Sequence, residues 1–279
     1  MSDLIFPSRQ VGEFTITAIS DGYLTASLDF LSNIDAADAA RMQSDAGQSA
    51  PTAVHINCYV VRGAGRTILI DAGAGGIKQW GGHLQAHLLL AGIDPSSIDT
   101  ILLTHAHPDH VGGLVGADGQ VSFPTAELVV HQQEIRFWQD DGNLSRASER
   151  ARGNFQIARR VFDGYGDRLR TFDAGEVLPG VRALPLPGHT EGHTGYVIES
   201  RDQGLLVWGD IVHFPHIQIQ RPDVTIAFDQ DASLAAATRS RLLDQVSSDD
   251  LMIAGMHLGE LGFARIKRTT GGYRLRYEA

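Results

Sequence analysis

The most informative part of the sequence is Thr104-His105-Ala106-His107-Pro108-Asp109-His110. It ends a run of β-branched residues and leucines, Ile98 to Thr104, that predicts a buried strand. Imidazoles and carboxylates are natural ligands of borderline divalent cations such as zinc. Alternation in an extended segment places His105 and His107 on one side, and the turn at Pro108 lets the next two ligands aim at a second point. We interpret the stretch as one loop that could serve two metal ions, rather than as a polar turn with scattered histidines.

Three further stretches place a side chain of the metal-ligand type at or just after the end of a predicted strand. They are Pro187-Gly188-His189-Thr190-Glu191-Gly192-His193, Leu206-Val207-Trp208-Gly209-Asp210 and Ile253-Ala254-Gly255-Met256-His257. A strand terminus is a rigid place from which to hold a ligand. These stretches therefore extend the candidate site beyond a single loop.

The order HxHxDH, GHTxGH, a late Asp and a late His resembles the metallo-β-lactamase superfamily. The strings 207–213 and 222–231 are similar to the branch that contains methyl parathion hydrolase and its lactonase or esterase relatives, and so is the spacing from Phe137-Trp138 to Gly272-Tyr273. The similarity extends from about Phe14 onward. It implies an α/β fold, a four-layer αββα sandwich of two mixed sheets flanked by helices, with metals at one edge of the sheets.

The resemblance also implies a ligand set. The first metal would be held by His105, His107 and His189, the second by Asp109, His110 and His257, and Asp210 would bridge them. The expected cofactors are two divalent metal ions, zinc before iron, cobalt or manganese. A water that bridges two dications loses its proton near neutral pH, and the metals polarise the substrate's carbonyl or phosphoryl oxygen. Asp109 is also the expected catalytic residue, which relays a proton to the leaving group.

Other candidates surround these ligands. Asp71, after the predicted strand 67–71, matches a family position that supports the ligand loop, and a turn-forming Asp is the alternative. His193 is interpreted as structural or as a hydrogen-bond partner behind the ligands. The roles of His213 and His216 stay open between pocket lining and packing. The candidate apolar substrate pocket contains Trp138, Phe155 and Phe214 with His213, although ordinary core is the alternative for each.

The resemblance implies a dinuclear metal-dependent hydrolase that cleaves lactone or aryl ester bonds by way of a bridging hydroxide. The alternatives are an acyl-homoserine lactonase and a phosphotriesterase of the methyl parathion hydrolase type. The segment Gly75–Trp80 departs from the latter pattern, which favours esters or lactones over organophosphates. Redox relatives usually carry a glutamate at the position of His107, so the histidine here favours hydrolysis over redox chemistry. Markers of serine acyl transfer and of nucleotide binding are absent.

Charge and composition limit the classes of binding partner that we expect. Among 279 residues, 23 are basic and 33 acidic, a formal net charge of −10, so the chain has no electrostatic footprint for nucleic acid. Its one cysteine, Cys58, excludes an intramolecular disulfide and a cysteine-rich zinc site. Neither a signal peptide nor an apolar run of membrane-spanning length is visible. We expect a cytoplasmic protein that binds a small ester, lactone or organophosphate and no membrane.

No linker separates two domains, so residues 1–279 are expected to form one domain, with 1–10 as a candidate N-terminal arm. Relatives form homodimers, and we expect the same here. Apolar periodicity predicts strands over 11–20, 56–61 and 67–71, and helices over 83–90, 148–162 and 233–246. The last helix is expected to bury Leu234, Ala237, Leu242 and Val246.

Overall fold

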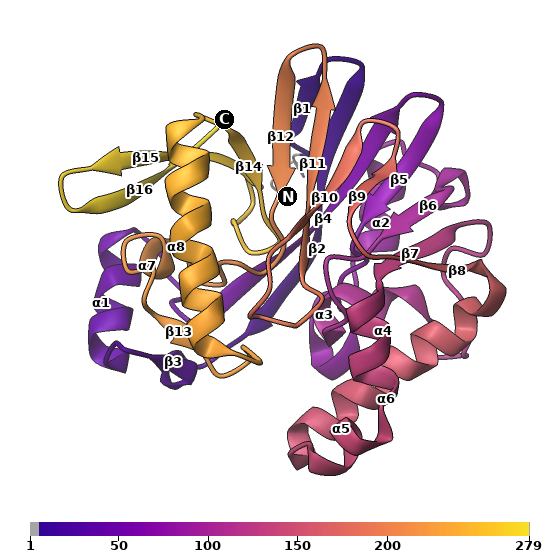
Figure 1. The fold of residues 1–279 in the computed structure, drawn as a ribbon, viewed down its shortest axis with the longest axis horizontal. Helices are drawn as coiled ribbons and strands as arrows, with labels where there is room; N and C mark the ends of the chain where they lie inside the picture. The colour runs from indigo at the N-terminus through magenta and orange to yellow at the C-terminus, as the bar shows by residue number, and fades with distance from the viewer. Residues whose placement is uncertain (1–5, 279) are drawn as a thin grey trace.

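The computed structural model describes residues 6–278. Its centre is a pair of seven-stranded sheets, shown in Figure 1. The first has the order β1 (Ser8–Val11), β2 (Phe14–Thr25), β4 (Ala53–Gly63), β5 (Arg66–Ile70), β6 (Thr100–Leu102), β7 (Glu127–His131) and β8 (Leu169–Phe172). The second has the order β16 (Gly272–Tyr277), β15 (Phe263–Thr269), β14 (Met252–Ala254), β12 (Gln203–Val207), β11 (Thr194–Ser200), β10 (Val181–Pro185) and β9 (Gly175–Leu178). A small sheet joins β3 (Leu31–Ser32) to β13 (Thr225–Ile226).

Both large sheets are mixed, as expected. In the first, β5, β6, β7 and β8 run parallel and the other pairs are antiparallel. In the second, only β12 and β14 are parallel. The parallel pairs matter for the site because their carboxyl ends meet at one edge of each sheet.

Helices cover the outer faces, which completes the predicted four-layer αββα sandwich. Helices α2 (Leu84–Leu90), α4 (Gln132–Gln139) and α6 (Glu149–Tyr165) share a core with the first sheet, and α8 (Ala232–Ser248) shares one with the second. Figure 1 shows α6 and α8 on opposite sides of the sheets. The other helices are α1 (Ala36–Asp45), α3 (Pro108–Val111), α5 (Asp141–Arg146) and α7 (Pro215–Gln218). Across residues 6–278, none of the helices is both long and apolar enough to cross a bilayer.

Strand β4 shows how the sequence supplies two cores at once. Cys58 points into the cluster under the helices, and the next residue, Tyr59, points into the cluster between the sheets. Both side chains are fully buried. A strand covered on both faces has a nearly continuous apolar run instead of alternation. Cys58 is therefore a buried core residue, as expected.

The N-terminal prediction needs correction. The predicted strand 11–20 is broken at Gly12 and Glu13, where the chain turns between β1 and β2. Gly12 has φ +55°, a conformation that glycine adopts at little cost. Residues 8–10 of the candidate arm therefore pair within the chain's own sheet. The part of that arm over residues 1–5 lies outside the described residues.

The predicted buried face of the last helix is only partly correct. Helix α8 is present and buries Leu242 and Val246 as expected, but Leu234 is 37% exposed and Ala237 is exposed as well. Ala235 and Arg239 are buried in their place. The buried Arg239 donates to the backbone oxygens of Ile211, Pro222 and Val224. The β15–β16 hairpin has no predicted counterpart.

Candidate metal centre and substrate pocket

The candidate ligands lie where neighbouring strands end. Asp71 follows β5, and the stretch 104–110 follows β6 and runs into α3. Asp210 follows β12, and His257 follows the adjacent β14. The loop between β10 and β11 carries His189. The parallel pairing of β5 with β6 and of β12 with β14 brings these loops to one edge of the two sheets.

The first cluster, the imidazole group, consists of His105, His107 and His189. Its three inward-facing nitrogens form a compact triangle. His107 Nδ1 is 3.0 Å from His105 Nε2 and 2.9 Å from His189 Nε2, and the remaining side is 3.2 Å. Alternation along the extended segment thus places His105 and His107 together.

The second cluster, the mixed group, consists of Asp109, His110, Asp210 and His257. Asp210 Oδ2 is 3.1 Å from His110 Nε2 and 3.2 Å from His257 Nε2. The same oxygen is 3.6 Å from His189 Nε2 and 3.8 Å from His105 Nε2. Asp210 therefore lies between the two groups.

Hydrogen bonds on the far side of three of the rings orient those histidines. Nδ1 of His189 lies 2.9 Å from Asp229 Oδ1, and Nδ1 of His110 lies 2.6 Å from Asp71 Oδ2. Nδ1 of His257 donates to the backbone oxygen of His55 at 2.7 Å. With its proton on Nδ1, a neutral ring in this orientation presents the Nε2 lone pair to the centre.

These residues fit a pair of divalent cations. Lone pairs of neutral imidazoles repel one another at about 3 Å, so the triangle of the imidazole group suits a positive ion at its centre. Asp210 Oδ1 is buried and has no hydrogen-bond partner within the described chain. Buried polar atoms normally have partners. The donor set of imidazole nitrogens and carboxylate oxygens is that of zinc and related metals.

The protonation preferences of the two groups differ. Burial holds the pKa of both His105 and His107 well below the usual value, which keeps them neutral. In the mixed group burial opposes ionisation too, but neighbouring opposite charges outweigh it. They lower the pKa of Asp210, with His110 contributing most, and they raise the pKa of His110. The mixed group therefore keeps anionic oxygens available at its centre.

The two supporting candidates contact the ligands directly from behind. Asp71 accepts hydrogen bonds from the Thr104 backbone N–H at 2.8 Å and hydroxyl at 2.7 Å, besides its contact with His110. Its φ of +56° is a strained conformation of the kind found at functional sites. His193 accepts from the backbone N–H of Asp210 at 2.9 Å, and its own Nδ1 donates to the Leu186 oxygen.

Sequence reasoning missed Glu134, which lies on α4 beneath the imidazole group. Its buried carboxylate accepts from the backbone N–H groups of Ala106 at 2.9 Å and Gly192 at 3.1 Å. It also accepts from the Trp138 indole at 2.9 Å and the Thr190 hydroxyl. One carboxylate thus joins the two loops that carry the imidazole group. A lone Glu in a predicted helix carries no sequence signal for such a role. Asp229, which contacts His189, was not singled out either, although it lies in the stretch 222–231 that resembles the family.

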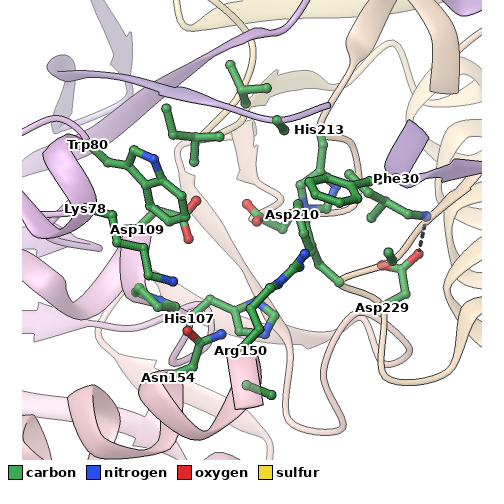
Figure 2. A pocket seen from close by; sticks show the side chains of 18 of the residues that line it. Phe30, Lys78, Trp80, His107, Asp109, Arg150, Asn154, Asp210, His213 and Asp229 are labelled. Atoms are coloured by element: carbon green, nitrogen blue, oxygen red, sulfur yellow. Dashed lines mark hydrogen bonds and ion pairs between the residues drawn. The ribbon is translucent and has the colours of Figure 1, made fainter. Parts of the chain in front are cut away.

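A cavity of about 680 Å³ opens above the two groups. His107, Asp109, Asp210 and His257 form part of its lining, and Figure 2 shows Asp109 and Asp210 facing the same space. The remaining lining is largely apolar and aromatic and includes Leu24, Phe30, Trp80, Phe137, Trp138, Phe155, Ile226 and Phe228. This is the usual character of a small-molecule site.

The pocket candidates divide. Trp138, Phe155 and His213 line the cavity, and His213 Nε2 is 3.1 Å from Asp210 Oδ2. Phe214 does not line it. Its side chain is buried in the apolar cluster that also contains Leu24 and Ile226, and it borders a neighbouring cavity. That second cavity also contains His216. Trp80, in the segment that departs from the methyl parathion hydrolase pattern, lies in the main pocket.

Comparisons with known proteins agree with this geometry. "Uncharacterized protein YobT" of Bacillus subtilis is 31% identical over 160 residues, which are 57% of this chain and 63% of that protein. A probable metallo-hydrolase of Mycobacterium tuberculosis is 26% identical over 55% of this chain and 49% of its own length. The chain therefore spans less than two thirds of these curated relatives.

Two solved structures superpose over nearly the whole chain. The hydrolase AbOPH, of the beta-lactamase superfamily, has a TM-score of 0.92 and 28% identity, covering 98% of this chain and 97% of its own. AidC, a dizinc quorum-quenching lactonase, has a TM-score of 0.91 and 27% identity, covering 100% and 99%. The sequence family described as the metallo-beta-lactamase superfamily matches residues 51–257. With the fold and the ligand clusters described above, the match establishes that this chain belongs to the metallo-β-lactamase superfamily.

Proposed function

We propose that the chain is a dinuclear metal-dependent hydrolase that cleaves lactone or aryl ester bonds. The observation that carries this proposal is the placement of the two ligand groups, joined by Asp210, at the bottom of an apolar and aromatic pocket. The imidazole group would hold one cation and the mixed group the other, with Asp210 shared. Two bound divalent cations supply Lewis acidity and a hydroxide at neutral pH.

The chain's own residues would orient the substrate and move a proton. Asp109 is the more accessible carboxylate of the mixed group, 13% exposed against 2% for Asp210. It borders the pocket, so it is the group placed to pass a proton to a leaving oxygen. Trp80, Trp138 and Phe155 would pack against an aryl or acyl group and exclude water around the scissile bond.

Two narrower activities have specific support. AidC was solved with N-hexanoyl-L-homoserine, a lactonase product, and it aligns with this chain from end to end. This favours an acyl-homoserine lactone as one substrate. A phosphotriester is the second candidate. The segment that contains Trp80 departs from the methyl parathion hydrolase pattern in sequence, but Trp80 still contributes an aromatic ring to the pocket.

The deciding experiment is a hydrolysis panel on protein of known metal content. It compares dihydrocoumarin, an acyl-homoserine lactone, methyl parathion and a cephalosporin. We expect the highest kcat/KM on a lactone or aryl ester, and loss of that activity on chelation with recovery when zinc is restored. A higher kcat/KM on methyl parathion than on any lactone would make the protein a phosphotriesterase. Absence of turnover by protein carrying two metals would refute the substrate class.

A further inference from the structure

Two cations face the pocket away from the ligand groups. Lys78 Nζ lies 4.9 Å from the centre of the Trp80 ring. Arg150 Cζ lies 4.9 Å from the Phe30 ring and 4.7 Å from the Phe228 ring. Both residues line the cavity, and in Figure 2 they approach it from different sides. Aromatic rings hold these cations in place without consuming their hydrogen-bond donors.

A polar side chain without a partner accompanies them. Asn154 lines the same cavity, and its Oδ1 is buried with no hydrogen-bond partner within the described residues. This oxygen is an acceptor and would be completed by a donor such as a water, whereas the Nδ2 of the same amide is the group that can donate to an anion. Figure 2 shows Asn154 beside Arg150, one helical turn apart on α6. We name Lys78, Arg150 and Asn154 the polar rim.

The placement of Arg150 does not serve helix stability. It lies in the first turn of α6, after the N-cap Ser148, where the positive end of the helix dipole disfavours a cation. No ion pair involving Arg150 or Lys78 occurs among residues 6–278. In an acidic chain, two cations that face a pocket without carboxylate partners are better explained by a ligand than by folding.

The carboxylates that border the pocket are committed elsewhere. Asp109 and Asp210 belong to the mixed group, and Asp229 contacts His189 Nδ1 and the backbone N–H of Ile226. They leave the polar rim free to receive an anion. Arg binds a carboxylate through paired N–H donors, and the Nδ2 of Asn154 can donate a third hydrogen bond.

We propose that the polar rim binds a carboxylate on the substrate, at the end remote from the scissile bond. The preferred substrates are then half-esters or lactones that carry a free carboxylate, rather than neutral esters. This inference rests on the proposed hydrolase function, because it assigns the substrate class of the same pocket.

The test compares 4-nitrophenyl hydrogen succinate with neutral 4-nitrophenyl butyrate on the dimetal enzyme. We expect a higher kcat/KM for the succinate and a smaller preference at high salt, since screening weakens exposed ion pairs. Arg150→Gln should lower the succinate-to-butyrate ratio about tenfold, as expected for the loss of one charge-assisted hydrogen bond. Arg150→Lys should retain part of the preference. Arg152→Gln, an exposed arginine on the same helix outside the pocket lining, is the matched control and should leave the ratio unchanged.

The outcomes separate the two proposals. If both esters are hydrolysed and Arg150→Gln leaves the ratio unchanged, the polar rim is refuted while the hydrolase function stands. If the wild type hydrolyses neither ester, the same compounds serve as ligands, and quenching of tryptophan fluorescence gives their Kd. Tighter binding of the succinate in the wild type than in Arg150→Gln would then support the rim without the proposed chemistry. Equal binding would refute the rim as well.

Discussion

The ligand cluster and the polar rim occupy the same pocket but differ in how their polar atoms are used. Around the ligands, the outward Nδ1 of His110, His189 and His257 each has a protein partner. At the rim, Asn154 Oδ1 has no hydrogen-bond partner within the described residues. Lys78 and Arg150 lie over aromatic rings. The rings of the cluster are therefore oriented before any substrate arrives, whereas the cations of the rim are left without an anionic partner.

This difference indicates a division of labour. Hydrogen bonds behind metal ligands fix ring orientation and raise metal affinity. Unsatisfied groups in a pocket discriminate among ligands, because the wrong ligand leaves them unpaired. Changes in the cluster should therefore abolish turnover of every substrate, and changes at the rim or the aromatic wall should alter the preference among substrates.

The largest effect is expected from Asp210→Ala. Because Asp210 lies between the imidazole and mixed groups, its loss should deplete both metals and lower kcat by at least about 10³-fold. His257→Ala should instead release mainly the cation of the mixed group. Elemental analysis of purified protein measures both. Retention of two metals by Asp210→Ala would contradict the shared position, and Asp249→Asn at an exposed helix end is the control.

A smaller effect is expected from Glu134→Gln. An amide cannot accept from all four donors that now converge on this carboxylate, so the two loops that carry the imidazole group should loosen. Metal affinity should fall about 10- to 100-fold, the usual cost of changing a residue behind metal ligands, and we expect the loss mainly as faster dissociation. Competition with a chromogenic chelator measures the rate.

Glu127→Gln provides the comparison for this change, because Glu127 pairs with Arg170 at a partly exposed position on β7. Its metal dissociation should match the wild type. Should Glu134→Gln lower the melting temperature yet release metal at the normal rate, Glu134 would have a structural role only.

The smallest effect is expected from Trp80→Ala. The half-buried Trp80 lines the pocket, and loss of its ring should raise KM for aryl esters about three- to tenfold. The KM for an alkyl ester of the same acid should change less, and Trp80→Phe should recover most of the loss. Equal increases for both esters would indicate a displaced loop rather than a lost aromatic contact.

The sequence alone was sufficient for the superfamily fold and for the positions that converge at the site. The stretch 104–110 carries three histidines and an aspartate in a fixed order, and strand-end placement of His189, Asp210 and His257 follows from local apolar runs. Such features are local, and local spacing and alternation determine them. The four-layer architecture followed from the resemblance that those residues carry.

Tertiary structure decided the contacts that depend on distant segments. The burial of Glu134 beneath two loops, the exposure of Leu234 on α8 and the exclusion of Phe214 from the main pocket depend on which faces pack together. The polar rim is of the same kind, since Lys78 and Arg150 are 72 positions apart in the numbering and only the fold brings them to one pocket. The periodicity of apolar residues indicates which side chains can be buried, but packing between elements determines which residues each side chain contacts.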